Sequence, residues 1–241
     1  VLTGTDYVYP RTTNRMLAAY LADQGVSPDD IMISYTPFGH TDWGRIVSDI
    51  KRFGSPGRKT AVISTINGDA NVAFYRELAA QGVSADSIPV LAFSIGEAEL
   101  QSMDVAPLVG HLAAWNYFMS LDNSVNREFL SAWQAFSNNP RAVGTDPLEA
   151  QAIGFQLWVE AAEHAQTVEP AEVRNALPGL EVANLSGGRA KMHSNHHLSK
   201  PVYIGQIRPD GQYDVIWQSN GSVTGDPWFD PLSAQSEEER Q

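Results

Sequence analysis

Four short segments of the sequence combine aromatic rings, hydroxyls, amides and carboxylates in a way that suits binding of a small polar molecule. Each follows a run that is predicted to be a β-strand, and the segments are 6–11, 66–69, 93–97 and 114–117. If those strands are neighbours in one parallel sheet, the segments meet at the edge where ligands of α/β proteins bind. The chemistry available there is hydrogen bonding to the N–H and carbonyl groups of a ligand.

Tyr7 and Tyr9 lie two residues apart in a segment that the sequence predicts to be extended, so both rings face the same side before Pro10 begins a helix. A pair of phenols offers flat apolar walls together with hydroxyls that donate to a carbonyl or accept from an amide. Packing at an interface explains two tyrosines equally well. The residues alone leave both interpretations open.

The turn Asn67-Gly68-Asp69 precedes a segment with helical periodicity. Gly68 permits a tight turn and a close approach of the backbone. Asp69 is favoured as the N-cap of the following helix, where its carboxylate accepts a backbone N–H. The same carboxylate has further lone pairs that can accept from the NH2 groups of an amide, so the two roles are compatible.

Ser94 stands three residues before Glu97, which is the spacing of a capping box at the start of a helix. This structural role is the favoured one. The Ser94 hydroxyl and the backbone amides of Ile95 and Gly96 are nevertheless groups that a ligand can reach at a helix N-terminus. The aromatic residues of 114–117 are more typical of core or interface packing than of ligand contact.

Catalysis, metal binding and nucleotide binding find no support in the sequence. The chain has no cysteine and lacks the G-x-S-x-G, S-x-x-K, P-loop and G-x-G-x-x-G motifs. His193, His196 and His197 are clustered, but adjacent residues of an extended chain point to opposite faces, so a structural role is favoured over a metal site. We therefore expect no catalytic residue, no metal and no cofactor.

Charge and hydropathy argue against two classes of partner. Sixteen basic and twenty-eight acidic residues give a formal net charge of -12, and the basic residues are dispersed, which argues against nucleic acid. A membrane-spanning helix needs about 18 to 20 consecutive apolar residues, and no run approaches that length. We therefore do not expect the chain to be integral to a membrane.

Short β-rich runs alternate with amphipathic segments through the first half of the chain. The expected strands are 31–35, 60–66, 90–93 and 108–113, and the expected helices are 13–24, 43–53, 70–81 and 97–103. This alternation predicts a parallel sheet with helices on both faces. Further along, we expect helices at 126–137, 146–166 and 170–177, and strands at 202–207 and 213–218 around a hairpin turn.

The change of pattern after residue 115 predicts two lobes. We assign 5–115 and 180–220 to the second, ligand-binding lobe and 118–178 to the helical part of the first lobe, whose sheet is expected to lie outside this chain. The first residues look like the inside of a strand, so we expect the chain to begin in the middle of a fold. Residues 233–241 are polar and acidic and are predicted to be a disordered tail.

These segments resemble the urea and short-chain amide binding proteins of branched-chain-amino-acid-type ABC transporters, which have the type I periplasmic binding protein fold. The resemblance runs through nearly the whole chain in family order. The matching stretches are GTDYVYPRTTN at 4–14, STINGDANVAFYREL at 64–78, FSIGEAEL at 93–100, AAWNYF at 113–118, TDPLEA at 145–150 and NHHLSKPVYIGQIRPDGQYDVIW at 195–217. One departure is large, because roughly the first third of a typical member is missing from this chain.

The resemblance implies an α/β fold of two Rossmann-like lobes with parallel sheets and hinge crossovers, in which hinge closure encloses the ligand. It implies that second-lobe positions face the ligand, and with the amide of Ile95 the predicted site is Tyr7, Tyr9, Asn67, Gly68, Asp69, Ser94 and Ile95. It also implies a periplasmic or lipid-anchored extracytoplasmic protein, with a signal sequence upstream of this chain, that delivers urea, formamide or acetamide to an ABC transporter permease.

Elementary chemistry also favours a neutral amide. Urea is small, planar and uncharged, so its affinity must come from satisfied hydrogen bonds rather than from apolar area. A cytoplasmic amide-sensing regulator of the same fold is the alternative function, and an amide hydrolase is less well supported because no nucleophile and base pair is apparent. One methyl group is worth only about 1 to 3 kcal/mol of discrimination, so the sequence does not choose among the three amides.

Overall fold

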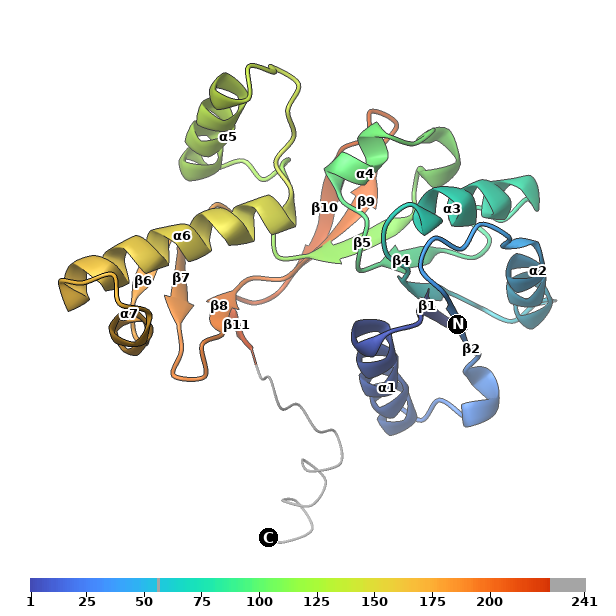
Figure 1. The fold of residues 1–241 in the computed structure, drawn as a ribbon. Coiled ribbons are helices and arrows are strands. Elements are labelled where there is room, and N and C mark those ends of the chain that lie inside the picture. Colours follow the sequence, from blue (N-terminus) through green and yellow to red (C-terminus); the bar gives the residue numbers. More distant parts are fainter. Residues whose placement is uncertain (56, 226–241) are drawn as a thin grey trace, which may run out of the picture.

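The computed structural model describes residues 1–55 and 57–225, and this part of the chain forms two units that are each built on a sheet of their own (Figure 1). The larger unit contains a seven-stranded sheet in the order β10-β9-β5-β4-β3-β1-β2. The smaller unit contains a four-stranded sheet in the order β11-β8-β7-β6. The predicted tail at 233–241 lies outside the described residues.

The larger sheet combines five parallel strands with an antiparallel hairpin. Its strands are β1 (Leu2–Thr5), β2 (Ile33–Thr36), β3 (Val62–Thr65), β4 (Val90–Ala92), β5 (Leu112–Trp115), β9 (Tyr203–Ile207) and β10 (Tyr213–Gln218). Strands β1 to β5 pair in parallel, β9 is antiparallel to β5, and β10 is antiparallel to β9. The predicted parallel sheet and hairpin are therefore confirmed.

Helices pack on this sheet as the alternation of the sequence predicts. They are α1 (Val8–Asp23), α2 (Gly44–Phe53), α3 (Ala70–Ala80) and α4 (Glu97–Gln101), with short 3-10 turns at Pro28–Asp30 and Ala106–Leu108. The main core lies between the sheet and α2, α3 and α4, where Val62 and Val90 meet Val47, Phe74 and Leu100. Helix α1 lies on the other side of the sheet (Figure 1).

The starts of α1 and β5 differ most from the sequence prediction. Helix α1 begins at Val8 rather than at residue 13, because Pro10 sits in the first turn, where its missing N–H costs no hydrogen bond. Strand β5 is Leu112–Trp115 rather than 108–113, because Pro107 lies in a 3-10 turn and cannot donate to a strand ladder.

The smaller unit consists of α5 (Ser124–Phe136), α6 (Asp146–Ala165) and α7 (Pro170–Ala176) with the short strands β6 (Glu181–Ala183), β7 (Arg189–Met192), β8 (Leu198–Lys200) and β11 (Val223–Thr224). The strands are antiparallel. Its core is formed where Ile153 and Leu157 of α6 pack against Val182, Ala190 and Met192 of the sheet.

The division between the units differs from the one expected from the sequence. Within the segment 180–220, only β9 and β10 join the larger sheet, whereas β6, β7 and β8 form the smaller sheet beside α6. Alternation along a strand shows which side chains are buried but not which sheet the strand joins, because pairing depends on distant residues. The chain therefore passes between the units three times, at 116–123, at 201–202 and at 219–222.

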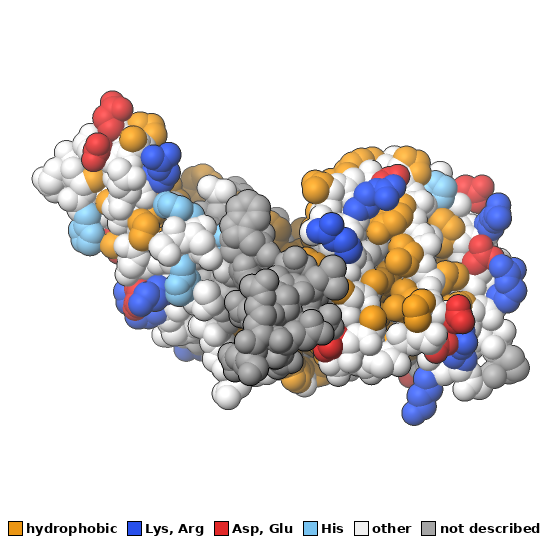
Figure 2. Space-filling model, turned by 90° about the horizontal axis from the view of Figure 1, so that it is seen from below, with side chains coloured by type: hydrophobic (Ala, Val, Ile, Leu, Met, Phe, Trp, Pro, Cys, Tyr) orange, Lys and Arg blue, Asp and Glu red, His pale blue; other side chains and the backbone are white. Residues whose placement is uncertain are grey.

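Only one face of the larger sheet is fully covered. Val62, Val90 and Ala92 are buried, while Ile63 and Leu91, which point to the opposite face, stay partly exposed. Figure 2 shows the molecule from below, with hydrophobic side chains gathered on the larger unit among scattered charged ones.

Candidate ligand-binding site

A cleft of about 600 Å³ lies where the carboxyl ends of β1, β3, β4 and β5 meet the start of α6. From the larger unit it is lined by Tyr7, Tyr9, Asn67, Gly68, Phe93, Ser94, Gly96, Ala98, Glu99 and Trp115, and from the smaller unit by Thr145, Asp146 and Pro147. Five of the seven residues of the predicted site, from three different loops, are thus brought together. The other two, Asp69 and Ile95, are not among the lining residues.

Tyr7 and Tyr9 lie side by side, but not in one extended run. Tyr7 has extended dihedrals (φ -159°, ψ -174°), and Tyr9 already belongs to the first turn of α1. Their ring centroids are 6.1 Å apart, and the ring centroid of Phe38 lies 4.9 Å from that of Tyr7. Gly4 allows this arrangement, because a Cβ there would lie 2.7 Å from Cβ of Pro10 and would push α1 away from β1.

Two hydroxyl groups of the cleft already donate hydrogen bonds to backbone carbonyls. The Tyr9 hydroxyl donates to the carbonyl of Phe93 at 3.2 Å, and the Ser94 hydroxyl donates to the carbonyl of Ile66. Burial raises the pKa of Tyr9 to about 12, so its proton stays in place at neutral pH. Both oxygens can therefore only accept from a ligand that leaves these bonds intact.

Asn67 also turns an acceptor toward a ligand. Its side-chain NH2 donates to the carbonyl of Thr65 at 2.9 Å, and its backbone N–H donates to the Thr5 hydroxyl at 2.9 Å, which leaves the carboxamide oxygen for other partners. Gly68 has φ +65°, a left-handed conformation that favours glycine, as the turn prediction requires.

Asp69 does not act as a side-chain cap. It precedes α3, but its carboxylate makes no capping hydrogen bond, and the residue is exposed. The reason is that its dihedrals are already helical (φ -62°, ψ -18°), whereas a capping side chain needs an extended backbone to reach the first amides of the helix. The capping prediction is wrong here.

The capping box predicted for Ser94 and Glu97 is also wrong, because the helix begins two residues later than that pairing requires. The N-cap of α4 is Gly96, whose N–H donates to the Glu99 carboxylate at 2.8 Å. Glu97 is buried instead, and its carboxylate accepts from the backbone N–H of Met119 at 2.7 Å. Burial raises the pKa of Glu97 to about 7.

Ile95 belongs to the core rather than to the cleft surface. Its side chain is fully buried. Its carbonyl accepts from the indole N–H of Trp115 at 2.7 Å and from the Tyr213 hydroxyl at 3.0 Å. Trp115 thus lines the cleft with a ring that this hydrogen bond fixes in place, although packing was the favoured interpretation of that segment.

The start of α6 also lies at the cleft, which was not predicted from the sequence. Thr145 is the N-cap of this helix, and its hydroxyl oxygen accepts from the backbone N–H of Leu148 at 3.3 Å. The Asp146 carboxylate accepts from the backbone N–H of Asn116 at 2.9 Å, and burial raises its pKa. A threonine followed by Asp-Pro is a helix-start signal, but it does not tell where the helix points.

Asn116 connects the two units at the base of the cleft. Besides its bond to Asp146, its side-chain NH2 donates to the carbonyl of Pro201 at 2.7 Å, and its carbonyl accepts from the Ser186 hydroxyl. Tyr203 donates to the carbonyl of Ser186 at 3.0 Å. The first two crossover segments, 116–123 and 201–202, are therefore joined to each other beside the ligand cleft.

Within 1–55 and 57–225, no helix has the length and hydropathy to cross a bilayer, and no cluster of three or more His, Cys, Asp or Glu residues could hold a metal ion. In the histidine-rich segment, a His193 ring nitrogen pairs with the Ser199 hydroxyl, and the His197 ring contacts the carbonyl of Asn195 at 3.0 Å.

A parallel α/β sheet with a cleft at its carboxyl edge, joined by three crossovers to a second unit, defines a hinged ligand-binding protein of the type I periplasmic class. Residues 1–234 match the family model described as a periplasmic binding protein domain. The chain belongs to this family.

Solved structures share the fold at low sequence identity. An amino acid ABC transporter substrate-binding protein from Pseudomonas fluorescens Pf-5 has a TM-score of 0.76 and 18% identity, over 94% of this chain and 59% of that one. A solute-binding protein of an ABC transporter from Rhodopseudomonas palustris HaA2, in complex with p-hydroxybenzoic acid, has a TM-score of 0.77 and 18% identity over 94% and 60%. A branched-chain amino acid ABC transporter ligand-binding protein from Burkholderia xenovorans LB400 gives 0.72 and 17% over 90% and 57%.

The chain thus spans about three fifths of the length of these structures. A protein named limonene hydroxylase from Geobacillus stearothermophilus is 30% identical over 132 residues, which cover 55% of this chain and 24% of that protein.

Proposed function

We propose that this chain is part of a solute-binding protein that captures a small uncharged amide, namely urea, formamide or acetamide, and delivers it to the permease of an ABC transporter outside the cytoplasm. Membership of the periplasmic binding protein family supports the binding role and the extracytoplasmic location. The names of the solved relatives support the transporter as partner.

The observation that carries the choice of ligand is the direction of the hydrogen bonds in the cleft. The hydroxyl protons of Tyr9 and Ser94 and one N–H of the Asn67 side chain go to backbone carbonyls. Oxygen lone pairs are left toward the cleft, together with the carboxylates of Glu99 and Asp146. A surface of acceptors suits a ligand that is rich in N–H groups, and urea carries four.

The charges of the cleft support an uncharged ligand over a carboxylate. The lining residues in the described part of the chain include Glu99 and Asp146 but no lysine, arginine or histidine. A benzoate-like anion would meet two carboxylates without a cationic partner, which is electrostatically unfavourable. The ligand class of the R. palustris relative therefore does not transfer readily to this cleft.

Closure of the two units gives such a small ligand its affinity. Urea has little apolar area, so its hydrogen bonds must form in a site that excludes water. The cleft lies between the units and next to the crossovers, so a hinge motion there can enclose the ligand.

The proposal is tested by calorimetric titration of urea, formamide, acetamide, leucine and 4-hydroxybenzoate into the full-length protein, with an ammonia assay on the same samples. Selective binding of one amide without ammonia release is the expected result. Binding of leucine or 4-hydroxybenzoate alone contradicts the amide ligand. Ammonia release contradicts a transport receptor and indicates an enzyme.

Tyr9→Phe is expected to weaken amide binding by about tenfold or more, because it removes a lone-pair acceptor and frees the Phe93 carbonyl that fixes it. The control is Tyr20→Phe, which removes an exposed phenol near the other end of the same helix. The melting temperature of both variants checks the fold. If the two variants bind the amide with equal affinity, Tyr9 has a packing role and does not contact the ligand.

Asp69→Asn tests the remaining carboxylate of the predicted site. The sequence predicts a loss of more than tenfold in amide affinity. Asp69 is exposed and its carboxylate makes no capping hydrogen bond. The substitution should therefore leave the free energy of unfolding nearly unchanged, so that a change in affinity reports on ligand contact alone. Calorimetry with the best amide measures it, and unchanged affinity removes Asp69 from the site.

A further inference from the structure

We propose that Asp146 is the ligand contact supplied by the smaller unit, and that its carboxylate accepts an N–H of the ligand while Tyr9 and Ser94 accept from the larger unit. This inference rests on the proposed function and deepens it, because it states how an amide is held between the two units. The sequence singled out no residue of the smaller unit for this role.

The position of Asp146 supports this role. It is the first residue of α6, and it lines the same cleft as Tyr9 and Ser94. Its Oδ1 atom is held by the backbone N–H of Asn116 at 2.9 Å, which fixes the carboxylate in one orientation. A carboxylate has about four lone-pair sites, so this bond leaves sites for a ligand.

The charges around Asp146 favour a hydrogen-bond donor of the ligand next to this carboxylate. The charged and titratable groups around the carboxylate are Lys200, Glu149, Glu97, Glu99 and Tyr117. Lys200 is paired with Glu149, so the one cation of this group is already engaged. An N–H group that approaches Asp146 therefore meets a carboxylate whose neighbouring cation, Lys200, is bonded to Glu149.

The same arrangement orients the ligand. The carbonyl oxygen of an amide is repelled by Asp146 and by Glu99, which lines the other unit's side of the cleft. The NH2 groups must then face these carboxylates. The carbonyl is left to point toward a donor such as the Tyr7 hydroxyl, which lines the same cleft.

Asp146→Asn tests the inference with little change of shape. The new carboxamide oxygen can keep the bond from Asn116, which turns the NH2 group toward the cleft and sets donor against donor. We expect amide affinity to fall by about 10- to 100-fold, the usual worth of a hydrogen bond to a charged group. Glu172→Gln is the matched control, because it removes an acidic side chain from the first turn of α7, away from the cleft.

Ligand selectivity distinguishes direct contact of Asp146 with the ligand from a purely structural role. Calorimetry compares urea with tetramethylurea and acetamide with N,N-dimethylacetamide, in the wild-type protein and in both variants. If Asp146 accepts a hydrogen bond from a ligand N–H, the wild type binds the unmethylated ligand more tightly than the methylated one. Asp146→Asn should then lower this affinity ratio by about 10-fold or more. A mere shift of the crossover would weaken both ligands equally, and such a result overturns the inference.

The outcomes distinguish this inference from the proposed function. Wild-type binding of an amide that Asp146→Asn leaves unchanged overturns the role of Asp146 alone. If the wild type binds leucine and no amide, and Asp146→Asn loses leucine, the amide ligand is overturned while Asp146 keeps its role as an N–H acceptor. Failure of the wild type to bind any of the probes overturns both.

Discussion

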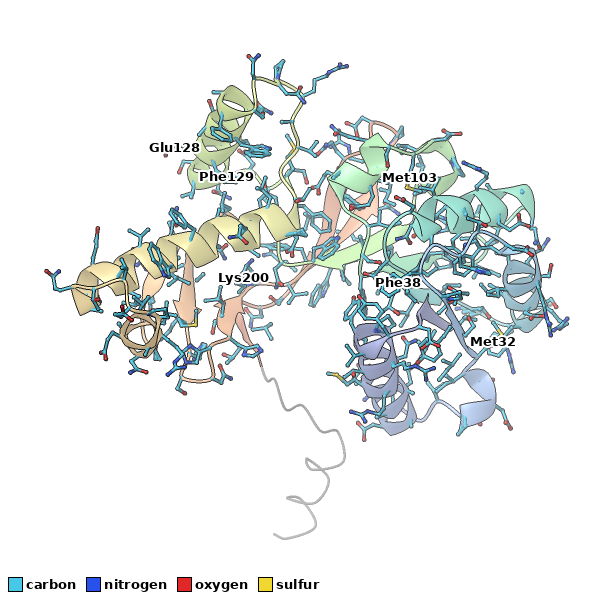
Figure 3. All side chains as sticks on the ribbon, viewed as in Figure 1. Met32, Phe38, Met103, Glu128, Phe129 and Lys200 are labelled. Atoms are coloured by element: carbon cyan, nitrogen blue, oxygen red, sulfur yellow. The ribbon has the colours of Figure 1, made fainter. Side chains whose placement is uncertain are left out.

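Lys200→Met is expected to lower the free energy of unfolding by about 3 to 5 kcal/mol, because it leaves a buried carboxylate without its cation. Lys200 lies on β8, beneath α6 (Figure 3), and its ammonium group pairs with the fully buried Glu149 of that helix. The Oε1 atom of Glu149 has no hydrogen-bond partner among the described residues, so little else compensates its charge. Equilibrium unfolding should use guanidinium chloride, because urea is a proposed ligand.

Two further variants make this test specific. Lys200→Met combined with Glu149→Leu should recover most of the lost stability, because replacing a whole buried ion pair by apolar groups is often neutral. Arg127→Met removes one partner of an exposed pair with Asp122 and should cost less than about 1 kcal/mol. A single Lys200→Met variant that is no less stable than Arg127→Met would show that Glu149 is not left as an isolated charge.

Local features of the fold were predictable because they depend on neighbours in sequence. The apolar spacing in 43–53, 70–81 and 146–166 sets which helix faces are buried, and the structure confirms α2, α3 and α6 there. The turn Asn67-Gly68-Asp69 was also predictable, since only a residue like glycine readily takes φ +65° at its centre.

The predictions of capping roles and of cleft residues failed where the outcome depends on the backbone angles of one residue or on a partner that is distant in sequence. Asp69 and Ser94 have the right residue types for capping, but capping depends on the dihedrals of a single residue, which the residue type does not fix. Asp146 reaches the cleft because Asn116, 30 positions earlier in the chain, holds it there. A contact between a crossover and the start of a helix leaves no periodic pattern in the sequence.

Glu97→Gln is expected to make the protein progressively more stable than the wild type as the pH rises from about 4.5 to about 7. Burial raises the pKa of Glu97 from the ordinary 4.5 to about 7, so the folded state holds a proton that the unfolded state has released in this range. Folding stability therefore falls as the pH rises, since the unfolded chain binds fewer protons. The shift corresponds to about 3 kcal/mol at full ionisation.

Glutamine mimics the protonated acid, because its carboxamide oxygen can still accept from the backbone N–H of Met119. The measurement is guanidinium chloride unfolding of both proteins between pH 4.5 and 7.5. Other titrating groups, including Glu149, contribute to both curves and cancel in the difference. Glu128→Gln, at an exposed position on α5 (Figure 3), should give a difference that does not vary with pH.

The difference in free energy of unfolding between Glu97→Gln and the wild type also gives information about the hinge, through its dependence on pH. Glu97 joins α4, whose residues Gly96 and Glu99 line the cleft, to the first crossover at Met119. An ionised Glu97 places a buried negative charge between these two elements, near Asp146 and Glu99. A difference that stays constant from pH 4.5 to 7.5 would mean that Glu97 is solvated in the folded protein, and hence that water enters this junction even when no ligand opens or closes the cleft.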